Sequence, residues 1–227
     1  MNTTNRMQEI INYSKDSSKV CDIGCDHGLV GISLILEHEI DLVIFSDILS
    51  EPLKSAINNT RQYEIDPKKV EFRLGDGLCP IESYEVDTVI ITGMGAKTIV
   101  EILSRDIKKT KSFKKFVLQP TSGEELLRLW LSDNSFVINK ESLIEDNGVF
   151  YETFCVSNGK SILTDKEIRF GKHIDYNCNE FISKYSKELE NLIKIRKAIP
   201  TKYQERIKKF NHEIMIIEEV LMKKDRK

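Results

Sequence analysis

Residues 19–28 read KVCDIGCDHG, and this stretch decides the fold. Its first five residues form a short apolar run that is typical of a buried strand, and the glycine-rich remainder is a turn that opens a helical pattern at Leu29. In α/β proteins such a turn lies at the carboxyl ends of the strands, where nucleotide-like ligands bind. The alternative is a simple tight connection between strand and helix, which uses the same glycines.

Apolar runs of strand length alternate with helical patterns from Lys19 to about Val156. This alternation predicts a doubly wound α/β fold, in which a parallel sheet is covered by helices on both faces. The expected strands are 19–23, 42–47, 70–74, 86–91 and 116–119, and the expected helices are 29–36, 52–63, 96–103 and 124–131.

Two further strand-like runs, 136–145 and 149–156, are separated by Asp146-Asn147-Gly148. Asn-Gly supplies the positive φ angles of a two-residue turn, so these runs should pair as an antiparallel hairpin. A mostly parallel sheet that closes with such a hairpin is typical of the Rossmann-like class I methyltransferases, whereas nicotinamide-binding domains end on parallel strands. A dehydrogenase-like domain is also disfavoured because the first turn lacks G-x-G-x-x-G.

The residues after Gly159 follow a helical pattern with apolar positions three and four apart, and Pro200 interrupts it. The pattern predicts an antiparallel helical coiled-coil hairpin with lysines on its outer faces. The expected apolar seam is Ile182, Tyr185, Leu189, Leu192, Ile199, Tyr203, Ile207, Phe210, Ile214, Ile217 and Leu221. We therefore expect a catalytic domain over residues 1–160 and a helical domain over 161–227.

The charge is distributed unevenly along the 227 residues. Residues 181–227 hold 13 Lys/Arg against 7 Asp/Glu, whereas residues 1–180 hold 21 against 29. A net charge of +6 at one end suggests contact with a polyanion, and a solvated lysine-rich helix is the alternative. No stretch approaches the ~20 apolar residues of a membrane span, and the polar N-terminus does not resemble a signal peptide, so a cytoplasmic protein without membrane contact is expected.

The five cysteines form no C-x-x-C pair and have no histidine at ligand spacing, so we expect reduced thiols and no metal site. The ends of the first three strands carry a different signal. Asp22 could bind the ammonium of S-adenosylmethionine, with Gly24 and Gly28 leaving room for its amino-acid portion. Asp47 could accept the ribose hydroxyls or cap the next helix, and Gly75-Asp76-Gly77 could receive the adenine amino group.

The end of the fourth strand reads Thr92-Gly93-Met94-Gly95 and contains no side-chain acid or base. Enzymes that methylate exocyclic amino groups of bases usually carry Asp/Asn-Pro-Pro-aromatic here, so that chemistry is disfavoured. A ring nitrogen such as N1 of adenine already has an in-plane lone pair, and it needs alignment with the methyl group more than deprotonation.

Six motifs together resemble the TrmK family of bacterial tRNA (adenine-22-N1)-methyltransferases. They are DIGCDHG at 22–28, the acid at 47, GDGL at 75–78, ITGMG at 91–95, LQP at 118–120 and the segment 145–151. The resemblance implies S-adenosylmethionine as cofactor and N1 of adenine 22 in tRNA as methyl acceptor, and the tail resembles the family's C-terminal coiled-coil domain. The chain departs from the family pattern at Ala96, where a further glycine is usual, and at Thr121, where asparagine often follows LQP.

On this interpretation the residues expected at the acceptor are Gly93, Met94, Gly95 and Gln119, with Asp26 or His27 as acceptor of the N6 proton. The residues expected to bind the cofactor are Asp22, Gly24, Asp26, His27, Gly28, Asp47, Ile48, Gly75, Asp76, Gly77, Thr92 and Gly93. Asp26 and His27 have the alternative role of positioning the cofactor or satisfying the helix N-terminus. The expected enzyme is a monomer with tRNA as partner. The alternatives are a catalytically silent protein that binds S-adenosylmethionine or RNA, and a methyltransferase acting on a small molecule or a protein.

Overall fold

The computed structural model describes residues 3–222, which divide between His173 and Ile174 into two compact units. The division comes later than the 160/161 boundary expected from the sequence. Residues 161–173 belong to the first unit because a buried arginine and glutamate hold them there. The Arg128 guanidinium donates to the Ile168 carbonyl at 3.1 Å, and Glu141, which is paired with Arg128, accepts the amides of Lys172 and His173 at 2.6 and 2.9 Å.

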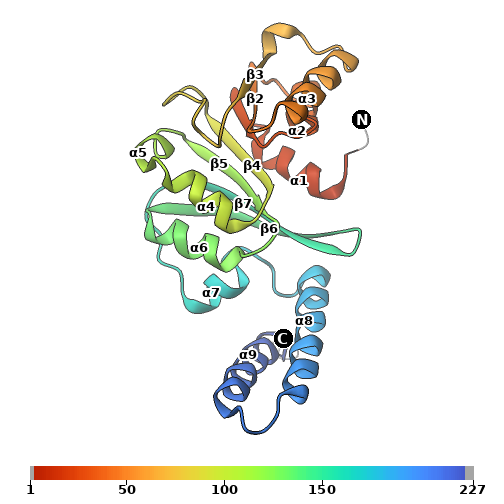
Figure 1. Ribbon diagram of the computed structural model, residues 1–227, viewed down its shortest axis with the longest axis vertical. Helices are drawn as coiled ribbons and strands as arrows, with labels where there is room; N and C mark the ends of the chain where they lie inside the picture. The colour runs from red at the N-terminus through yellow and green to blue at the C-terminus, as the bar shows by residue number, and fades with distance from the viewer. Residues whose placement is uncertain (1–2, 223–227) are drawn as a thin grey trace. The chain divides into compact units, whose positions relative to one another are not determined.

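The first unit is built on a seven-stranded sheet with the order β3-β2-β1-β4-β5-β7-β6 (Figure 1). The strands are β1 Lys19–Ile23, β2 Leu42–Asp47, β3 Val70–Leu74, β4 Thr88–Met94, β5 Lys115–Pro120, β6 Phe136–Asp146 and β7 Val149–Asn158. β1 to β5 are parallel and β7 is antiparallel to both β5 and β6. The chain reverses its direction of winding between β1 and β4, which is where doubly wound sheets bind ligands.

Helices cover both faces of this sheet. They are α1 Asn5–Ser14, α2 Leu29–Glu37, α3 Ser50–Gln62, the short η1 Pro67–Lys69, α4 Ala96–Ser104, α5 Ile107–Thr110, α6 Glu124–Asp133 and α7 Asp165–Phe170. One apolar layer includes residues of α1, α2 and α3, and the other includes residues of α4 and α6. Alternate residues of a strand enter opposite layers, as Ile90 and Ile91 do, so the strands read as continuous apolar runs.

The closing hairpin confirms the interpretation of Asn147-Gly148. Asp146 pairs with Val149, and the two turn residues have φ angles of 52° and 80°. These are the positive values that a two-residue turn needs to match the twist of its strands.

Two differences from the predicted elements bear on the site. β4 begins at Thr88 instead of residue 86 and continues to Met94, with a bulge at Gly93 between its partners on β5. The N-terminal helix α1 was not expected, although Thr4 caps it by accepting the Met7 amide at 3.3 Å and Ile10 is buried against the sheet.

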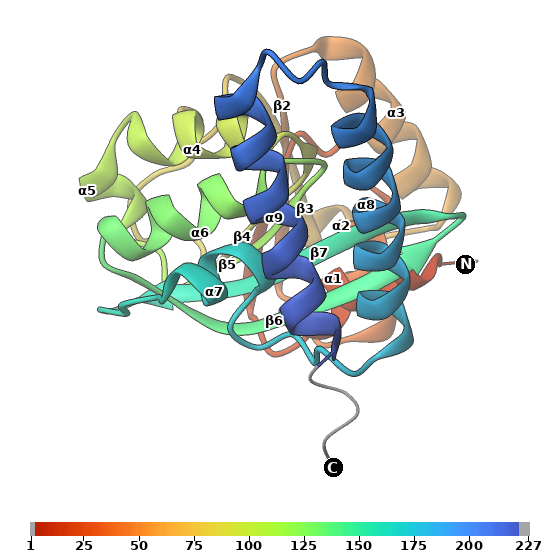
Figure 2. The ribbon, with the colours of Figure 1, turned by 90° about the horizontal axis from the view of Figure 1, so that it is seen from below.

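The second unit contains α8 Asn179–Ala198 and α9 Gln204–Met222, which lie side by side as a helical hairpin (Figure 2). α8 ends two residues before Pro200, as expected. Of the expected seam, Tyr185 and Ile217 are buried whereas Tyr203 is 51% exposed. Arg196 breaks the apolar pattern and donates to Asn211 of the other helix at 3.0 Å. The last basic residues, 223–227, lie outside the described part of the chain.

Candidate functional site

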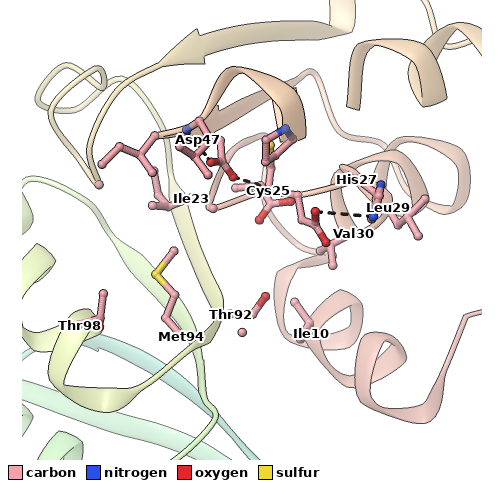
Figure 3. A pocket seen from close by; sticks show the side chains of 18 of the residues that line it. Ile10, Ile23, Cys25, His27, Leu29, Val30, Asp47, Thr92, Met94 and Thr98 are labelled. Atoms are coloured by element: carbon pink, nitrogen blue, oxygen red, sulfur yellow. Dashed lines mark hydrogen bonds and ion pairs between the residues drawn. The ribbon is translucent and has the colours of Figure 1, made fainter. Parts of the chain in front are cut away.

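A cavity of about 700 Å³ opens at the carboxyl ends of β1, β2, β3 and β4. Eleven of the twelve residues expected to bind a cofactor line it, namely Asp22, Gly24, Asp26, His27, Asp47, Ile48, Gly75, Asp76, Gly77, Thr92 and Gly93. Figure 3 shows Ile10 of α1 and Thr92 and Met94 of β4 on one side of the space, with Cys25 and Asp47 across from them. Residues distant in sequence meet here because parallel strands end at one edge of the sheet.

The first turn is held by backbone hydrogen bonds to the neighbouring strand. The amides of Gly24 and Cys25 donate to the Ser46 carbonyl at 2.8 and 3.2 Å, and Gly24 has a φ of 69°. A Cβ atom built on Gly24 would lie 2.2 Å from the Cε atom of Met94. Gly24 therefore lets the first turn approach the end of β4 closely.

Gly28 differs from the expectation, since it is not among the residues that line the cavity. It precedes α2 with a φ of 69°, and a Cβ atom there would lie 3.0 Å from the Ala56 Cβ and 3.1 Å from the Phe45 ring. The missing side chain of Gly28 therefore allows close packing of α2 against β2 and α3.

Asp22 is the most deeply buried acid of the cavity, with 3% of its surface exposed. Burial raises the pKa of its carboxyl to about 7, and the nearby carboxylates of Asp47 and Asp26 add to the shift. Such a group is poised to become ionised when a cation binds beside it.

Asp47 is the last residue of β2, as the sequence predicts, and its carboxylate bonds to the surrounding backbone. Oδ1 accepts the Leu49 amide at 2.9 Å, and Oδ2 lies 3.5 Å from the Asp26 amide nitrogen. The carboxylate therefore serves as a local cap while lining the cavity, so the two roles considered for this residue are compatible.

Asp26 and His27 lie at the exposed mouth of the cavity. Their side chains are 72% and 59% exposed, and the His27 Nε2 atom is 3.6 Å from an Asp26 oxygen. The Nδ1 atom of His27 lies 2.6 Å from the Ser55 hydroxyl, and the His27 backbone carbonyl accepts a hydrogen bond from the Asn59 side-chain amide at 2.9 Å. His27 is thus fixed between the turn and α3.

The turn after β3 brings Asp76 to the cavity. The Gly75 amide donates to the Asp47 carbonyl at 2.9 Å, which links the ends of β2 and β3. Arg105 forms an ion pair with one Asp76 oxygen at 2.7 Å and leaves the other carboxylate oxygen outside this pair. The ion pair therefore connects the Asp76 carboxylate, beside the cavity, to α4's C-cap residue Arg105.

The four residues after Ile91 have different positions. Thr92, Gly93 and Met94 line the cavity, and Gly93 is the bulged residue with a φ of 75°. Gly95 precedes α4 and does not line it, which differs from its expected place at the acceptor. The bulge turns the backbone at this strand end toward the cavity.

Gln119 also differs from the expectation, because it is fully buried and does not line the cavity. Its amide nitrogen donates to the Thr153 hydroxyl at 2.7 Å, and its amide oxygen accepts a hydrogen bond from the Nε atom of Arg6. Gln119 therefore holds Arg6, and its buried position lies outside the lining of the cavity.

α1 contributes residues that sequence reasoning missed. Thr4, Arg6, Met7 and Ile10 line the cavity, and the Arg6 guanidinium lies 4.5 Å from the centre of the Tyr151 ring. The capping threonine and the apolar spacing after it were the available signals for this helix.

All five cysteines are free. Within residues 3–222 no helix is long and apolar enough to span a membrane. In the same range, no three His, Cys, Asp or Glu side chains are grouped as a metal would require.

The fold and the position of the cavity define the class of Rossmann-like, class I methyltransferases. The model of the TrmK family, tRNA (adenine(22)-N(1))-methyltransferase, matches residues 20–219, and the chain belongs to this family.

Known proteins resemble the chain in sequence and in structure. The tRNA (adenine(22)-N(1))-methyltransferase of Bacillus subtilis is 28% identical over 154 residues, which cover 68% of this chain and 64% of that protein. Sp1610 of Streptococcus pneumoniae, solved with S-adenosyl-L-methionine, superposes with a TM-score of 0.87 at 29% identity and covers 97% of this chain and 100% of its own. TrmK of M. capricolum, solved with S-adenosylhomocysteine, gives 0.85 at 25% identity and covers 96% and 97%.

Proposed function

We propose that this protein transfers a methyl group from S-adenosylmethionine to N1 of adenine 22 in tRNA. The observation that carries the proposal is the family match over residues 20–219, in a chain whose cavity lies at the carboxyl ends of β1 to β4. A tRNA substrate also implies a cytoplasmic site of action, and we propose a monomeric enzyme.

The residues of the cavity fit S-adenosylmethionine in size and in charge. A volume of about 700 Å³ is within the range of cofactor sites, and four aspartates line the space. Asp22 would bind the ammonium, Asp47 the ribose hydroxyls and Asp76 the adenine amino group, while Ile48 would cover the adenine with its exposed side chain. When bound, S-adenosylmethionine supplies an electrophilic methyl group on a sulfonium sulfur.

The end of β4 would orient the acceptor. Gly93 and Met94 shape the cavity wall through a bulged backbone and a thioether, and neither supplies a base. An adenine N1 lone pair needs alignment instead of deprotonation, so a site of this composition suits ring-nitrogen methylation. The adenine must first leave its stack so that its Watson–Crick edge reaches the cavity.

Methylation of N1 acidifies the N6 amino group, whose proton can then leave to water or to the protein. Asp26 and His27 lie at the exposed mouth of the cavity with their side chains 3.6 Å apart. We assign them the role of accepting that proton or transferring it to solvent.

The test is methyl transfer from labelled S-adenosylmethionine to an unmodified tRNA transcript and to one with guanine at position 22. Incorporation that is lost with the substitution supports enzyme, substrate and position together. Asp47→Ala should raise the Kd for S-adenosylmethionine at least ~10-fold because the ribose loses its charged acceptor. Cofactor binding without incorporation into either transcript would favour a silent binding protein or a different acceptor.

A further inference from the structure

Arg6 is the only lysine or arginine among the described residues that line the cavity. Its Nε atom is bonded to Gln119, and its guanidinium lies over the Tyr151 ring. Within residues 3–222 neither of its terminal nitrogens forms a hydrogen bond or an ion pair. An arginine that is fixed at one edge and has free donors at the other suits recognition of an anionic group.

The contacts around Arg6 make it a prepared site. Gln119 is fully buried and is itself fixed by Thr153 at 2.7 Å, so the acceptor of the Nε hydrogen bond cannot easily move. The ring of Tyr151 lies 4.5 Å from the guanidinium carbon and restricts the orientation of the group. Less rotational freedom is therefore lost when a ligand binds to the remaining donors.

The position of Arg6 identifies the part of the cavity that it serves. The Cβ position built on Gly93 has Arg6 Nη2 as its nearest neighbour, at 3.8 Å, and the Cβ position built on Gly24 lies against Met94. Arg6 thus borders the same end of the cavity as the first turn, which follows Asp22. The end of the cavity formed by β1 and β4 therefore has the buried Asp22 carboxyl on β1 and the Arg6 guanidinium beside β4.

We propose that Arg6 binds the carboxylate of the amino-acid portion of S-adenosylmethionine while Asp22 binds its ammonium, an inference that rests on the proposed function. An amino-acid zwitterion needs one partner of each sign, and Arg6 is the cation that the described part of the cavity provides. Gln119 and Tyr151 act through Arg6 as positioning residues. A phosphate of tRNA is the competing anion, and binding measurements without tRNA separate the two.

The experiment compares calorimetric binding of S-adenosylmethionine and of its decarboxylated form, which keeps the ammonium and the sulfonium and lacks only the carboxylate. Arg6→Met should raise the Kd for S-adenosylmethionine about 10- to 100-fold, the effect of losing a charge-assisted hydrogen bond, and should leave the Kd for the decarboxylated form within about twofold. Arg6→Lys should give an intermediate loss, because it keeps the charge without the planar fork. Lys68→Met, at an exposed position that does not line the cavity, is the matched control and should bind both ligands as the unsubstituted protein does.

Each outcome has a separate meaning. Unchanged binding of S-adenosylmethionine to Arg6→Met overturns the inference, and a simultaneous rise in the KM for tRNA would assign Arg6 to a phosphate of the substrate. An equal loss for both ligands also overturns it, since the carboxylate would then not be the group that Arg6 contacts. Failure of the unsubstituted protein to bind S-adenosylmethionine would contradict the proposed function itself.

Discussion

At the scale of single residues, the buried acid Asp22 links stability to ligand binding. Its pKa of about 7 in the folded protein lies well above the ~3.9 of an unfolded chain, chiefly because of burial. The folded state therefore holds an extra proton between about pH 4 and 7, and the free energy of unfolding falls as the pH rises through this window. Above pH 7 the cavity contains a poorly solvated negative charge, which a bound cation would stabilise.

Asp22→Asn removes that charge and tests this linkage. Without cofactor, we expect the variant to unfold at a temperature at least ~2 °C higher than the unsubstituted protein at pH 8, and at nearly the same temperature at about pH 4, where the carboxyl is largely protonated in the folded state and about half protonated in the unfolded chain. It should bind S-adenosylmethionine more weakly at both pH values. Thermal unfolding by circular dichroism measures the first effect and calorimetry the second. A variant that is destabilised equally at both pH values would show that Asp22 is ionised and well paired in the fold.

The sequence predicted the positions of the cavity's acidic residues better than those of the glycines and of Gln119. Asp22 and Asp47 could be placed because a residue at the end of a parallel strand must lie at the ligand edge of the sheet. The sequence shows that Gly28 permits a positive φ, but not that its missing side chain makes room for Phe45. Gln119 was expected at the acceptor. Its amide oxygen instead accepts a hydrogen bond from Arg6, which lies on a helix that was not predicted.

At the scale of elements, the packing of α2 on β2 depends on a glycine inside the helix. A Cβ atom on Gly31 would lie 2.4 Å from the Phe45 ring and 2.7 Å from Val43, both shorter than any normal contact. Phe45 cannot easily withdraw because it is stacked on Phe72 with ring centres 5.3 Å apart. The close approach keeps the first turn, which leads into α2, next to the end of β2.

Gly31→Ala should therefore lower the free energy of unfolding by about 1–3 kcal/mol, although alanine has the higher helix propensity by ~1 kcal/mol. The loss should be smaller when Phe45→Leu is already present, because the shorter side chain leaves room for the methyl group. Urea denaturation of the four proteins in this double-mutant cycle gives the coupling. Strict additivity would mean that Phe45 is not the residue that excludes the methyl group.

Elements with a local chemical signal were predicted well. The closing hairpin follows from Asn147-Gly148, and the end of α8 follows from Pro200, since both depend on backbone geometry that the sequence dictates. α1 is amphipathic and capped by Thr4, but its importance comes from burial against distant strands. The bulge at Gly93 likewise depends on pairing with β5, which only the assembled sheet defines.

At the scale of the whole molecule, charge differs between the two units. The cavity of the first unit is lined by four aspartates and one arginine, whereas the chain from residue 181 onward has a net charge of +6. The acidic cavity suits the positively charged cofactor, and the basic hairpin suits the phosphates of tRNA. The cavity of the first unit and the chain from residue 181 onward thus each carry the charge opposite to that of the ligand proposed to bind there.

If the hairpin contacts phosphates, neutralising its exposed lysines should weaken tRNA binding without affecting the cofactor. Lys194 and Lys197 lie exposed on α8, and Lys68 and Lys108, which are also exposed, belong to the first unit and serve as the matched control. We expect Lys194→Gln with Lys197→Gln to raise the KM for tRNA several-fold and to reduce the slope of log KM against log salt by about one to two, roughly one for each lost phosphate contact. The control pair should change neither quantity. Methylation kinetics over a range of salt concentrations measure both, and an equal effect of the two pairs would mean that tRNA responds to net charge instead of to the hairpin.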